Sequence, residues 1–342
     1  MYPFVLTLVR MMTVVPSVKI NPVLDRIQFR RNEIKDAIEN NDPVDDHLHV
    51  VAVLSNPCNY RKRVSLMQDF IRRMQFENHV VLYIVELAYG GQAFSVTSHD
   101  NPQHLQMRCE TPLWHKENMI NLGIRKLLPA DWKAVAWVDS DIDFENNDWA
   151  SDTLKVLNGC RDIVQLFSHA LDMDAHQEVM NIFNSFSFKY EREMPNTGKA
   201  NNYWHPGYAW ACTRRAYETM GGLFDKAVLG SGDYIMSSCL INRGLQSVST
   251  QYSDEYKETV LEFQTKVRRL RLGYVPGVIR HFFHGSKVNR KYVERNSILL
   301  KYLWRPSMVS YNAEGLIVPG PLFPTGLKCE IADYFAQRKE DD

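Results

Sequence analysis

The stretch that decides the fold is AWVDSDIDFENNDWA, residues 136–150. An apolar run ends abruptly at Asp139, and two more aspartates, Asp141 and Asp143, follow at alternate positions. A short apolar run bounded by charged residues predicts a buried strand. Because side chains alternate across a strand, Asp139 and Asp141 are expected on the same side. Three carboxylates this close repel one another, so the sequence predicts that something positive is held with them.

The chain around this stretch alternates between apolar runs and helical patterns. Valine-rich runs predict buried strands, and apolar residues at helical spacing predict the helices between them. This alternation is typical of an α/β fold with a mainly parallel sheet flanked by helices, in which ligands bind beyond the carboxyl ends of the strands. The predicted strands are 47–55, 79–89, 134–138 and 162–167, and the predicted helices are 60–76, 114–127 and 148–157.

Three regions differ in composition. Residues 1–46 end in an acidic, polar segment and predict a peripheral N-terminal extension. Residues 47–310 carry the alternating pattern and predict one domain. Its first part (47–145) contains the aspartates, and its second part (146–310) is richer in aromatic residues and glycines. Residues 311–342 contain Gly and Pro without a strong period and predict a C-terminal tail.

Bulk composition sets a few limits. The formal net charge is zero, so overall charge does not steer the chain to nucleic acid or to membranes. The six cysteines are scattered without a CxxC pair, which predicts neither a zinc site nor a disulfide framework and favours a reducing compartment. Arg10 and Pro16 interrupt the apolar N-terminus, so we expect no membrane span and no signal peptide.

The aspartates suggest a metal. Two carboxylates that offer only oxygen suit a hard divalent cation, Mg²⁺ or Mn²⁺. Such ions commonly take their remaining ligands from water and phosphate, so the pattern predicts a nucleotide diphosphate held through a metal. The alternative is a solvent-exposed turn whose aspartates cap helices, and Asp143 and Asp148 fit that alternative well.

The segment VAWVDSDIDF resembles the Asp-x-Asp strand end of GT-A glycosyltransferases. Three further segments agree in order. LWHKENMINLGIRKLL resembles the helix that precedes this motif in β-1,4-galactosyltransferase-like enzymes. YWHPGYAWACTRRAYETMGGLFDKAVLGSGDYIM resembles their acceptor-side segment, with only one acid kept in the Gly-rich turn, and GVIRHFFHGSK resembles their late histidine segment. The resemblance spans roughly 48–295 and implies a GT-A (Rossmann-like) fold with a smaller acceptor-side subregion, and a metal-dependent, inverting glycosyltransferase.

The resemblance also implies roles for single residues. Asp141 is expected to bind the metal with His284, or alternatively His281, and Asp139 to contact the ribose. Asp233 stands where these enzymes keep the catalytic base, although it also fits as a helix cap. Further donor-binding candidates are Ser55, Asn56, Pro57, Arg63, Glu86, Lys116 and Lys287. Acceptor-binding candidates are Trp204, His205, Tyr208, Arg268, Arg269, Arg290 and Lys291.

A basic run bears on the acceptor. Between Lys266 and Arg305 there are eleven basic residues and one acid, Glu294, a pattern that fits a phosphate backbone. The alternative is that these residues serve the donor diphosphate and surface ion pairs. The segments SNP, VELAYG, YWHPGYAWA and RKYVERN further resemble viral glycosyltransferases encoded beside thymine- or methylcytosine-oxidising dioxygenases, and the base J-associated DNA glucosyltransferases.

This second resemblance implies a specific reaction. The donor would be UDP-glucose, the cofactor Mn²⁺ or Mg²⁺, and the acceptor the hydroxymethyl group of hydroxymethyluracil or hydroxymethylcytosine in double-stranded DNA. Such an enzyme is expected in the nucleus, or alternatively in the cytoplasm. The alternative function is a UDP-sugar-dependent glycosyltransferase acting on a glycan or a small acceptor.

Overall fold

The computed structural model describes residues 38–39, 41–196 and 203–342. Most of the predicted N-terminal extension, including the apolar N-terminus, lies outside the described residues. Within the described ranges, no helix is both long and apolar enough to cross a membrane.

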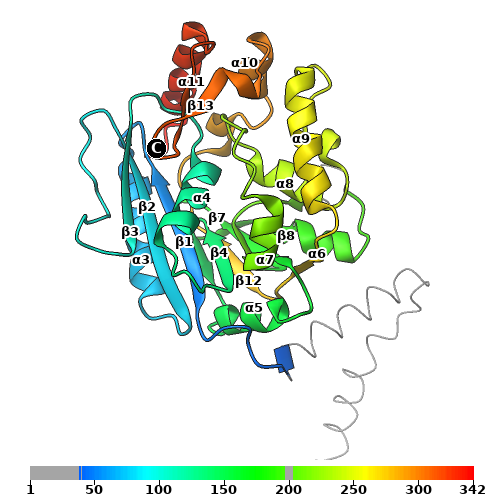
Figure 1. The fold of residues 1–342 in the computed structure, drawn as a ribbon. Helices are drawn as coiled ribbons and strands as arrows, with labels where there is room; N and C mark the ends of the chain where they lie inside the picture. Colours follow the sequence, from blue (N-terminus) through cyan, green and yellow to red (C-terminus); the bar gives the residue numbers. More distant parts are fainter. Residues whose placement is uncertain (1–37, 40, 197–202) are drawn as a thin grey trace, which may run out of the picture.

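A seven-stranded sheet forms the centre of the molecule (Figure 1). Its order is β11-β6-β10-β4-β1-β2-β3; β10 is antiparallel to both of its neighbours, and the other pairs are parallel. The predicted fold class, a mixed α/β fold with a mainly parallel sheet, is therefore confirmed. The strands are β1 (Leu48–Ser55), β2 (Val80–Tyr89), β3 (His104–Cys109), β4 (Ala134–Val138), β6 (Ile163–Gln165), β10 (Ala209–Thr213) and β11 (Leu272–Tyr274).

A second, smaller sheet has the order β5-β12-β7-β8-β9. It contains the strand that directly follows the aspartates and the strand that ends at His281, which are paired antiparallel. A two-stranded hairpin lies near the C-terminus. The strands are β5 (Ile142–Phe144), β7 (His169–Met173), β8 (Val179–Ser185), β9 (Trp204–His205) and β12 (Val278–His281), with β13 (Val309–Tyr311) and β14 (Ile317–Pro319) in the hairpin.

Helices cover both faces of the large sheet, which explains why its central strands are apolar throughout. The neighbouring residues Val50 and Val51 on β1 are both fully buried, but they pack into different cores. Helices α3 (Arg61–Met74) and α5 (Trp149–Leu157) pack into the core of Val50. The core of Val51 takes α4 (Lys116–Leu127), α6 (Phe186–Glu191), α7 (Arg214–Met220), α8 (Gly232–Leu240), α9 (Asp254–Val267), α10 (Asn296–Lys301) and α11 (Thr325–Gln337).

The C-terminal region differs from the predicted tail. Helix α11 packs beside α10 (Figure 1), and its residues Leu327 and Ile331 are fully buried. The sequence does carry the signal, because Leu327, Ile331 and Phe335 recur every four residues, as on one face of a helix. The Gly and Pro residues that precede this helix obscure its four-residue spacing in the sequence. Residues 311–342 therefore contribute side chains to the core that contains Val51.

The packing of α4 on the sheet gives a first prediction. A Cβ atom at Gly123 would lie 2.8 Å from methyl carbons of both Val51 and Val85, so Gly123→Ala overpacks the contact. Overpacking costs about 1–3 kcal/mol, and the better helix propensity of Ala returns about 1 kcal/mol. We expect the free energy of unfolding in urea to fall by up to about 2 kcal/mol. The control is Gly91→Ala, where nothing lies within 4 Å; greater stability of Gly123→Ala than wild type would contradict the packing argument.

Candidate active site

A pocket of about 700 Å³ opens at the carboxyl ends of β1 and β4. It is lined by residues from both sheets, from the starts of α4 and α8, from α10 and from the segment after α11. Parallel strands bring their carboxyl ends to one edge, which is where open α/β sheets bind ligands. The two sheets and the C-terminal region thus meet around one cavity.

The turn with Asp139 and Asp141 joins the two sheets. The backbone N–H of Asp139 donates to the carbonyl of Tyr208, next to β10, at 2.8 Å. The carbonyl of Asp141 accepts the N–H of Phe282, just after β12, at 2.7 Å. Asp139 is thereby tied to the large sheet and Asp141 to the small one. The strand alternation expected from the sequence does not apply, because β4 ends before the turn, yet both side chains line the pocket.

Asp141 lies beside two histidines. Its Oδ2 is 2.7 Å from Nε2 of His284 and 3.7 Å from Nε2 of His281. One ligand atom from each of the three residues lies within 4.8 Å of the other two. Burial alone would raise the pKa of Asp141, but the neighbouring imidazoles hold it well below its usual value. Burial would lower the pKa of His281, and the Asp141 carboxylate raises it instead.

The hydrogen bonding of this cluster fits a metal ion. Oδ1 of Asp141 is buried without a hydrogen-bond partner among the residues that the structure describes, although buried polar atoms normally have one. Nε2 of His284 lies 2.7 Å from Nη2 of Arg290 as well as from Asp141, and one ring nitrogen cannot accept from the first and donate to the second at once. A carboxylate with two imidazoles is a donor set for a divalent transition-metal ion such as Mn²⁺, since Mg²⁺ prefers oxygen.

Asp139 forms an ion pair with Lys116, the first residue of α4. Both side chains are about three-quarters buried. Burial raises the pKa of Asp139, Lys116 opposes that rise, and Asp141 adds to it. Burial alone would lower the pKa of Lys116, but the Asp139 carboxylate raises it above its usual value. The two aspartates therefore have separate partners, the lysine for Asp139 and the two imidazoles for Asp141.

Asp233 reaches the pocket from the first turn of α8. Its Oδ1 accepts the backbone N–H of Tyr234 at 2.8 Å. Its Oδ2 lies so close to Gly207 that a Cβ there would approach it to 2.7 Å, so a larger residue at 207 would push the carboxylate aside. The preceding Ser231 has a φ of 77°, a left-handed conformation that turns the chain sharply into the helix. Backbone geometry thus fixes the direction of this carboxylate.

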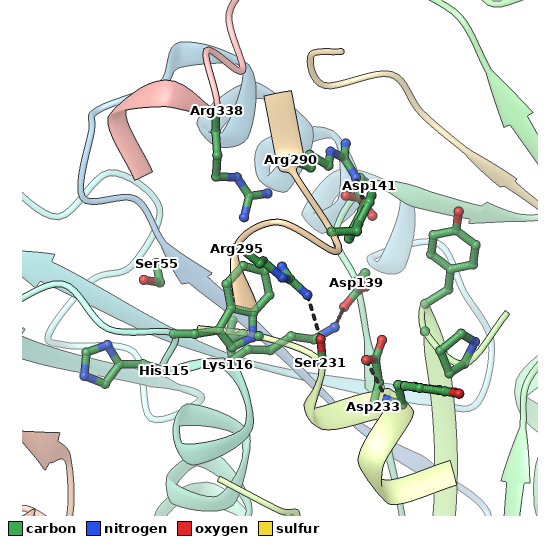
Figure 2. A pocket seen from close by; sticks show the side chains of 18 of the residues that line it. Ser55, His115, Lys116, Asp139, Asp141, Ser231, Asp233, Arg290, Arg295 and Arg338 are labelled. Carbon is green, nitrogen blue, oxygen red and sulfur yellow. Dashed lines mark hydrogen bonds and ion pairs between the residues drawn. The ribbon is translucent and has the colours of Figure 1, made fainter. Parts of the chain in front are cut away.

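Three arginines add positive charge to the same pocket (Figure 2). Arg290 lies beside Asp141, and its Nη1 donates to the hydroxyl of Tyr292 at 2.9 Å. Arg295 donates to the hydroxyl of Ser231 at 2.8 Å. Arg338 and Arg295 also lie over the ring of Trp114, at 5.3 and 5.7 Å from its centroid. Together they give the cavity the charge that an anionic group such as a diphosphate requires.

Glu340, close to the C-terminus, is buried beside Arg338, with 1% of its side chain exposed. It pairs with both Arg63 and Arg338. Burial would raise the pKa of Glu340, but these arginines hold it well below its usual value. Tyr60, just before α3, donates its hydroxyl to the carbonyl of Phe335 at 2.9 Å and so also ties this segment to the rim. The C-terminal segment is therefore one wall of the pocket.

The structure brings most of the predicted site residues together and leaves several outside. Thirteen of them line the pocket: Ser55, Pro57, Arg63, Lys116, Asp139, Asp141, His205, Tyr208, Asp233, His281, His284, Lys287 and Arg290. Six do not: Asn56, Glu86, Trp204, Arg268, Arg269 and Lys291.

Three of the six have structural contacts instead. Glu86 is buried, and its carboxylate accepts the backbone N–H groups of residues 95–97 at 2.6–3.1 Å, so it organises a loop rather than a donor site. Asn56 bonds both backbone groups of Tyr60 and closes the turn before α3. Trp204 packs edge-on against Phe186 in the core. A position at a strand end is shared by binding and by turn-forming residues, so the sequence could not separate them.

The basic run does not form one continuous cationic face. Arg268 and Arg269 are exposed at the end of α9, away from the pocket, and Lys291 bonds the side chain of Gln337. Other members of the run pair with acids that are distant in sequence. These pairs are Arg271 with Asp162, Arg280 with Glu145, Lys287 with Asp172 and Lys301 with Glu330.

Several pocket residues were not predicted as site residues. Arg295 belongs to the basic run between Lys266 and Arg305, and Arg338 and Glu340 come from the predicted C-terminal tail, where the sequence shows an ordinary polar surface pattern. Glu117 on α4 does not line the pocket, but it packs its carboxyl against Gly232, where a Cβ would lie 2.5 Å from it, and burial raises the pKa of Glu117 to about 8. A second acid therefore reaches the Gly-rich turn from another segment, which no local motif could reveal.

No protein-family model and no curated protein matches the chain. Among solved structures, the chain is similar to a mannosyltransferase from Pyrobaculum calidifontis in complex with GDP-Man and Mn²⁺. The identity is 11%, the match covers 92% of this chain and 81% of that chain, and the TM-score is 0.39. It is also similar to a mutant of Drosophila β1,4-galactosyltransferase 7 in complex with manganese, UDP-Gal and xylobiose; the identity is 12%, the match covers 80% of this chain and 94% of that chain, and the TM-score is 0.36. Similarities this distant do not establish a function for the chain.

The Glu340 pairs predict that stability depends on pH in the acid range. Because folding lowers the pKa of Glu340 from about 4.5, its stabilisation is complete above that pH and is lost as the pH falls below it. Glu340→Ala is expected to lower the free energy of unfolding at pH 7 by about 3–5 kcal/mol, since the buried Arg338 and the partly buried Arg63 lose their partner. Urea unfolding at pH 7 and pH 3.5 should show this difference shrinking in acid.

The matched control is Asp342→Ala, which removes an exposed acid from the same end of the chain. It is expected to leave stability unchanged at both pH values. A loss in Glu340→Ala that is the same at pH 7 and pH 3.5 would contradict the ion-pair explanation.

Proposed function

We propose that the chain is a metal-dependent, inverting glycosyltransferase of the GT-A type that uses a UDP-sugar donor. One observation carries this proposal. The pocket holds a cluster of Asp141, His281 and His284 beside pocket-lining arginines, and a separate carboxylate, Asp233, enters from another helix. The first group suits a diphosphate with a divalent cation, and the second suits proton removal from an acceptor.

The donor side is assigned to residues around the small sheet. Asp141, His281 and His284 would hold the divalent cation, with Mn²⁺ suited better than Mg²⁺ to two imidazoles, and both histidines rather than one of them are assigned as ligands. When bound, the cation would neutralise charge that develops on the leaving diphosphate. Arg290 and Lys287 add further positive charge at the same edge of the pocket. Asp139, held by Lys116, and the loop with Ser55 and Pro57 after β1 are assigned to the ribose and base.

Asp233 is assigned as the general base. Its Oδ1 is held by the backbone N–H of Tyr234, and its place in the first turn of α8 brings the carboxylate to the pocket, as a base requires. Oδ2 would take the proton of the acceptor hydroxyl as that oxygen attacks the anomeric carbon through an oxocarbenium-like state. Attack from the side opposite the leaving group inverts the anomeric centre.

The acceptor side carries a flat aromatic surface. The rings of His205 and Tyr208 are stacked, with centroids 4.0 Å apart and planes within 10°, and both residues line the pocket. Burial lowers the pKa of His205 to about 3, so this ring is neutral near pH 7 and adds no charge to the surface. A neutral aromatic shelf suits a sugar ring or a planar base.

The identity of the acceptor is proposed from the sequence resemblance. That resemblance supports transfer of glucose from UDP-glucose to hydroxymethyluracil or hydroxymethylcytosine in DNA, by an enzyme of the nucleus. The exposed Arg268 and Arg269 are available to a phosphate backbone. The second candidate is transfer to a glycan or a small acceptor. It is favoured by the ion pairs of Arg271, Arg280 and Lys301, which take these side chains away from a DNA-binding face.

Two pocket variants test the mechanism. Asp141→Asn is expected to abolish Mn²⁺-dependent hydrolysis of UDP-glucose, because the metal loses its carboxylate. Asp233→Asn is expected to keep Mn²⁺ and UDP binding but to lose about 10²- to 10⁴-fold in kcat for transfer, because proton removal fails. The control is Asp143→Asn, whose carboxylate pairs with Arg73 outside the pocket. Hydrolysis by Asp141→Asn at the wild-type rate would refute the metal assignment.

Labelled UDP-glucose separates the two acceptors. Incubation with duplex DNA containing hydroxymethyluracil, hydroxymethylcytosine or neither should label only modified DNA if the DNA proposal holds. Binding of that DNA should weaken steeply as salt rises, since counterions are released from phosphates. Label in no DNA, together with intact hydrolysis of the donor, would refute the DNA acceptor and favour a glycan or a small acceptor.

A further inference from the structure

The small sheet places three acidic or imidazole side chains in one row. Asp141 directly precedes β5, and His281 on β12 is in register with Ile142 of β5. On its other side, His281 is in register with Asp172 on β7, in a parallel pair. The pairing between β7 and β8 shifts at Asp172, and such irregularities re-aim side chains next to sites. Three hydrogen-bonded strands therefore present Asp141, His281 and Asp172 in sequence.

Asp172 contacts the far side of the His281 ring. Its Oδ1 lies 2.8 Å from Nδ1 of His281, whereas Nε2 of the same ring points to Asp141. The other oxygen of Asp172 pairs with Lys287. Asp172 is 1% exposed and does not line the pocket, so it cannot touch a substrate there. A deeply buried carboxylate therefore stands directly behind an imidazole of the cluster.

We propose that Asp172 is the positioning residue that makes His281 a metal ligand, a role that rests on the metal site of the proposed function. A carboxylate at Nδ1 keeps the proton on that nitrogen and leaves the lone pair on Nε2 facing Asp141. It also fixes the plane of the ring. Lys287 holds the second oxygen, so the carboxylate cannot rotate away.

The variant Asp172→Asn replaces only the carboxylate oxygen that faces Nδ1 of His281. Lys287 donates to the second oxygen, so the asparagine would turn its own oxygen to the lysine and its NH₂ to Nδ1 of His281. The ring would then accept at Nδ1 and carry its proton on Nε2, where it no longer binds a metal. Loss of such supporting groups typically lowers metal affinity about 10- to 100-fold.

The experiment measures Mn²⁺ binding by the full chain without donor or acceptor. Titration of Mn²⁺, followed by the EPR signal of the free ion, should give a Kd for Asp172→Asn that is about 10- to 100-fold higher than that of the wild type. Electron spin echo spectra of the bound ion should show weaker nitrogen coupling, because one imidazole is lost. Asp172→Ser, which removes the carboxylate with less bulk, provides the same comparison should the amide variant fail to fold.

The control is Glu145→Gln, which breaks the pair with Arg280, the neighbour of His281, without touching the ring. It is expected to bind Mn²⁺ as the wild type does. Wild-type affinity and nitrogen coupling in Asp172→Asn or Asp172→Ser would overturn the inference while leaving the metal site intact. No Mn²⁺ binding by the wild-type chain would refute the metal site of the proposed function itself.

Discussion

A carboxylate taken out of water is stable only when opposite charge or hydrogen bonds reach it, and Asp141 is such a carboxylate, with 19% of its side chain exposed. Residues 138–144 of the chain carry no positive charge, so the compensating charge must come from elsewhere. His281 and His284 arrive more than a hundred residues later, and Arg290 follows them. Residues from the second half of the chain therefore stabilise a carboxylate that lies next to the edge of the large sheet.

The division into two sheets gives the two aspartates different surroundings. Asp139 is fixed to the large sheet and paired with Lys116, whereas Asp141 is fixed to the small sheet beside the histidines. Two adjacent carboxylates with equal surroundings would compete for one cation. Here the ammonium group of Lys116 partly neutralises Asp139. Oδ1 of Asp141 keeps no hydrogen-bond partner within the described part of the chain. The short turn between the sheets thus gives Asp139 and Asp141 different surroundings, which the sequence Asp-Ser-Asp alone does not distinguish.

Four strands of the large sheet, β1, β2, β4 and β6, were predictable because their signal is local, whereas β3, β10 and β11 were not among the predicted strands. Val50 and Val51 on β1 are buried on opposite faces, and a continuous apolar run records that directly. The small sheet was not predictable, since β5 has three residues and draws its stability from β12, far along the chain. Glu86 lies within β2, and its sequence context does not show that its carboxylate binds a loop instead of a donor. The pairing of Asp172 with His281 depends on strand register, which the sequence does not display.

The C-terminal segment shows that the site and the stability of the fold share the same charges. Arg63 and Arg338 line the pocket, but Glu340 already pairs with both. The positive charge available to an anionic ligand therefore comes mainly from Arg290 and Arg295, because Lys287 in turn pairs with Asp172. Without Glu340, the cavity would be more cationic, but the arginines would repel one another in a desolvated place. Glu340 thus stabilises the C-terminal wall of the pocket and also limits the positive charge that the pocket offers to an anion.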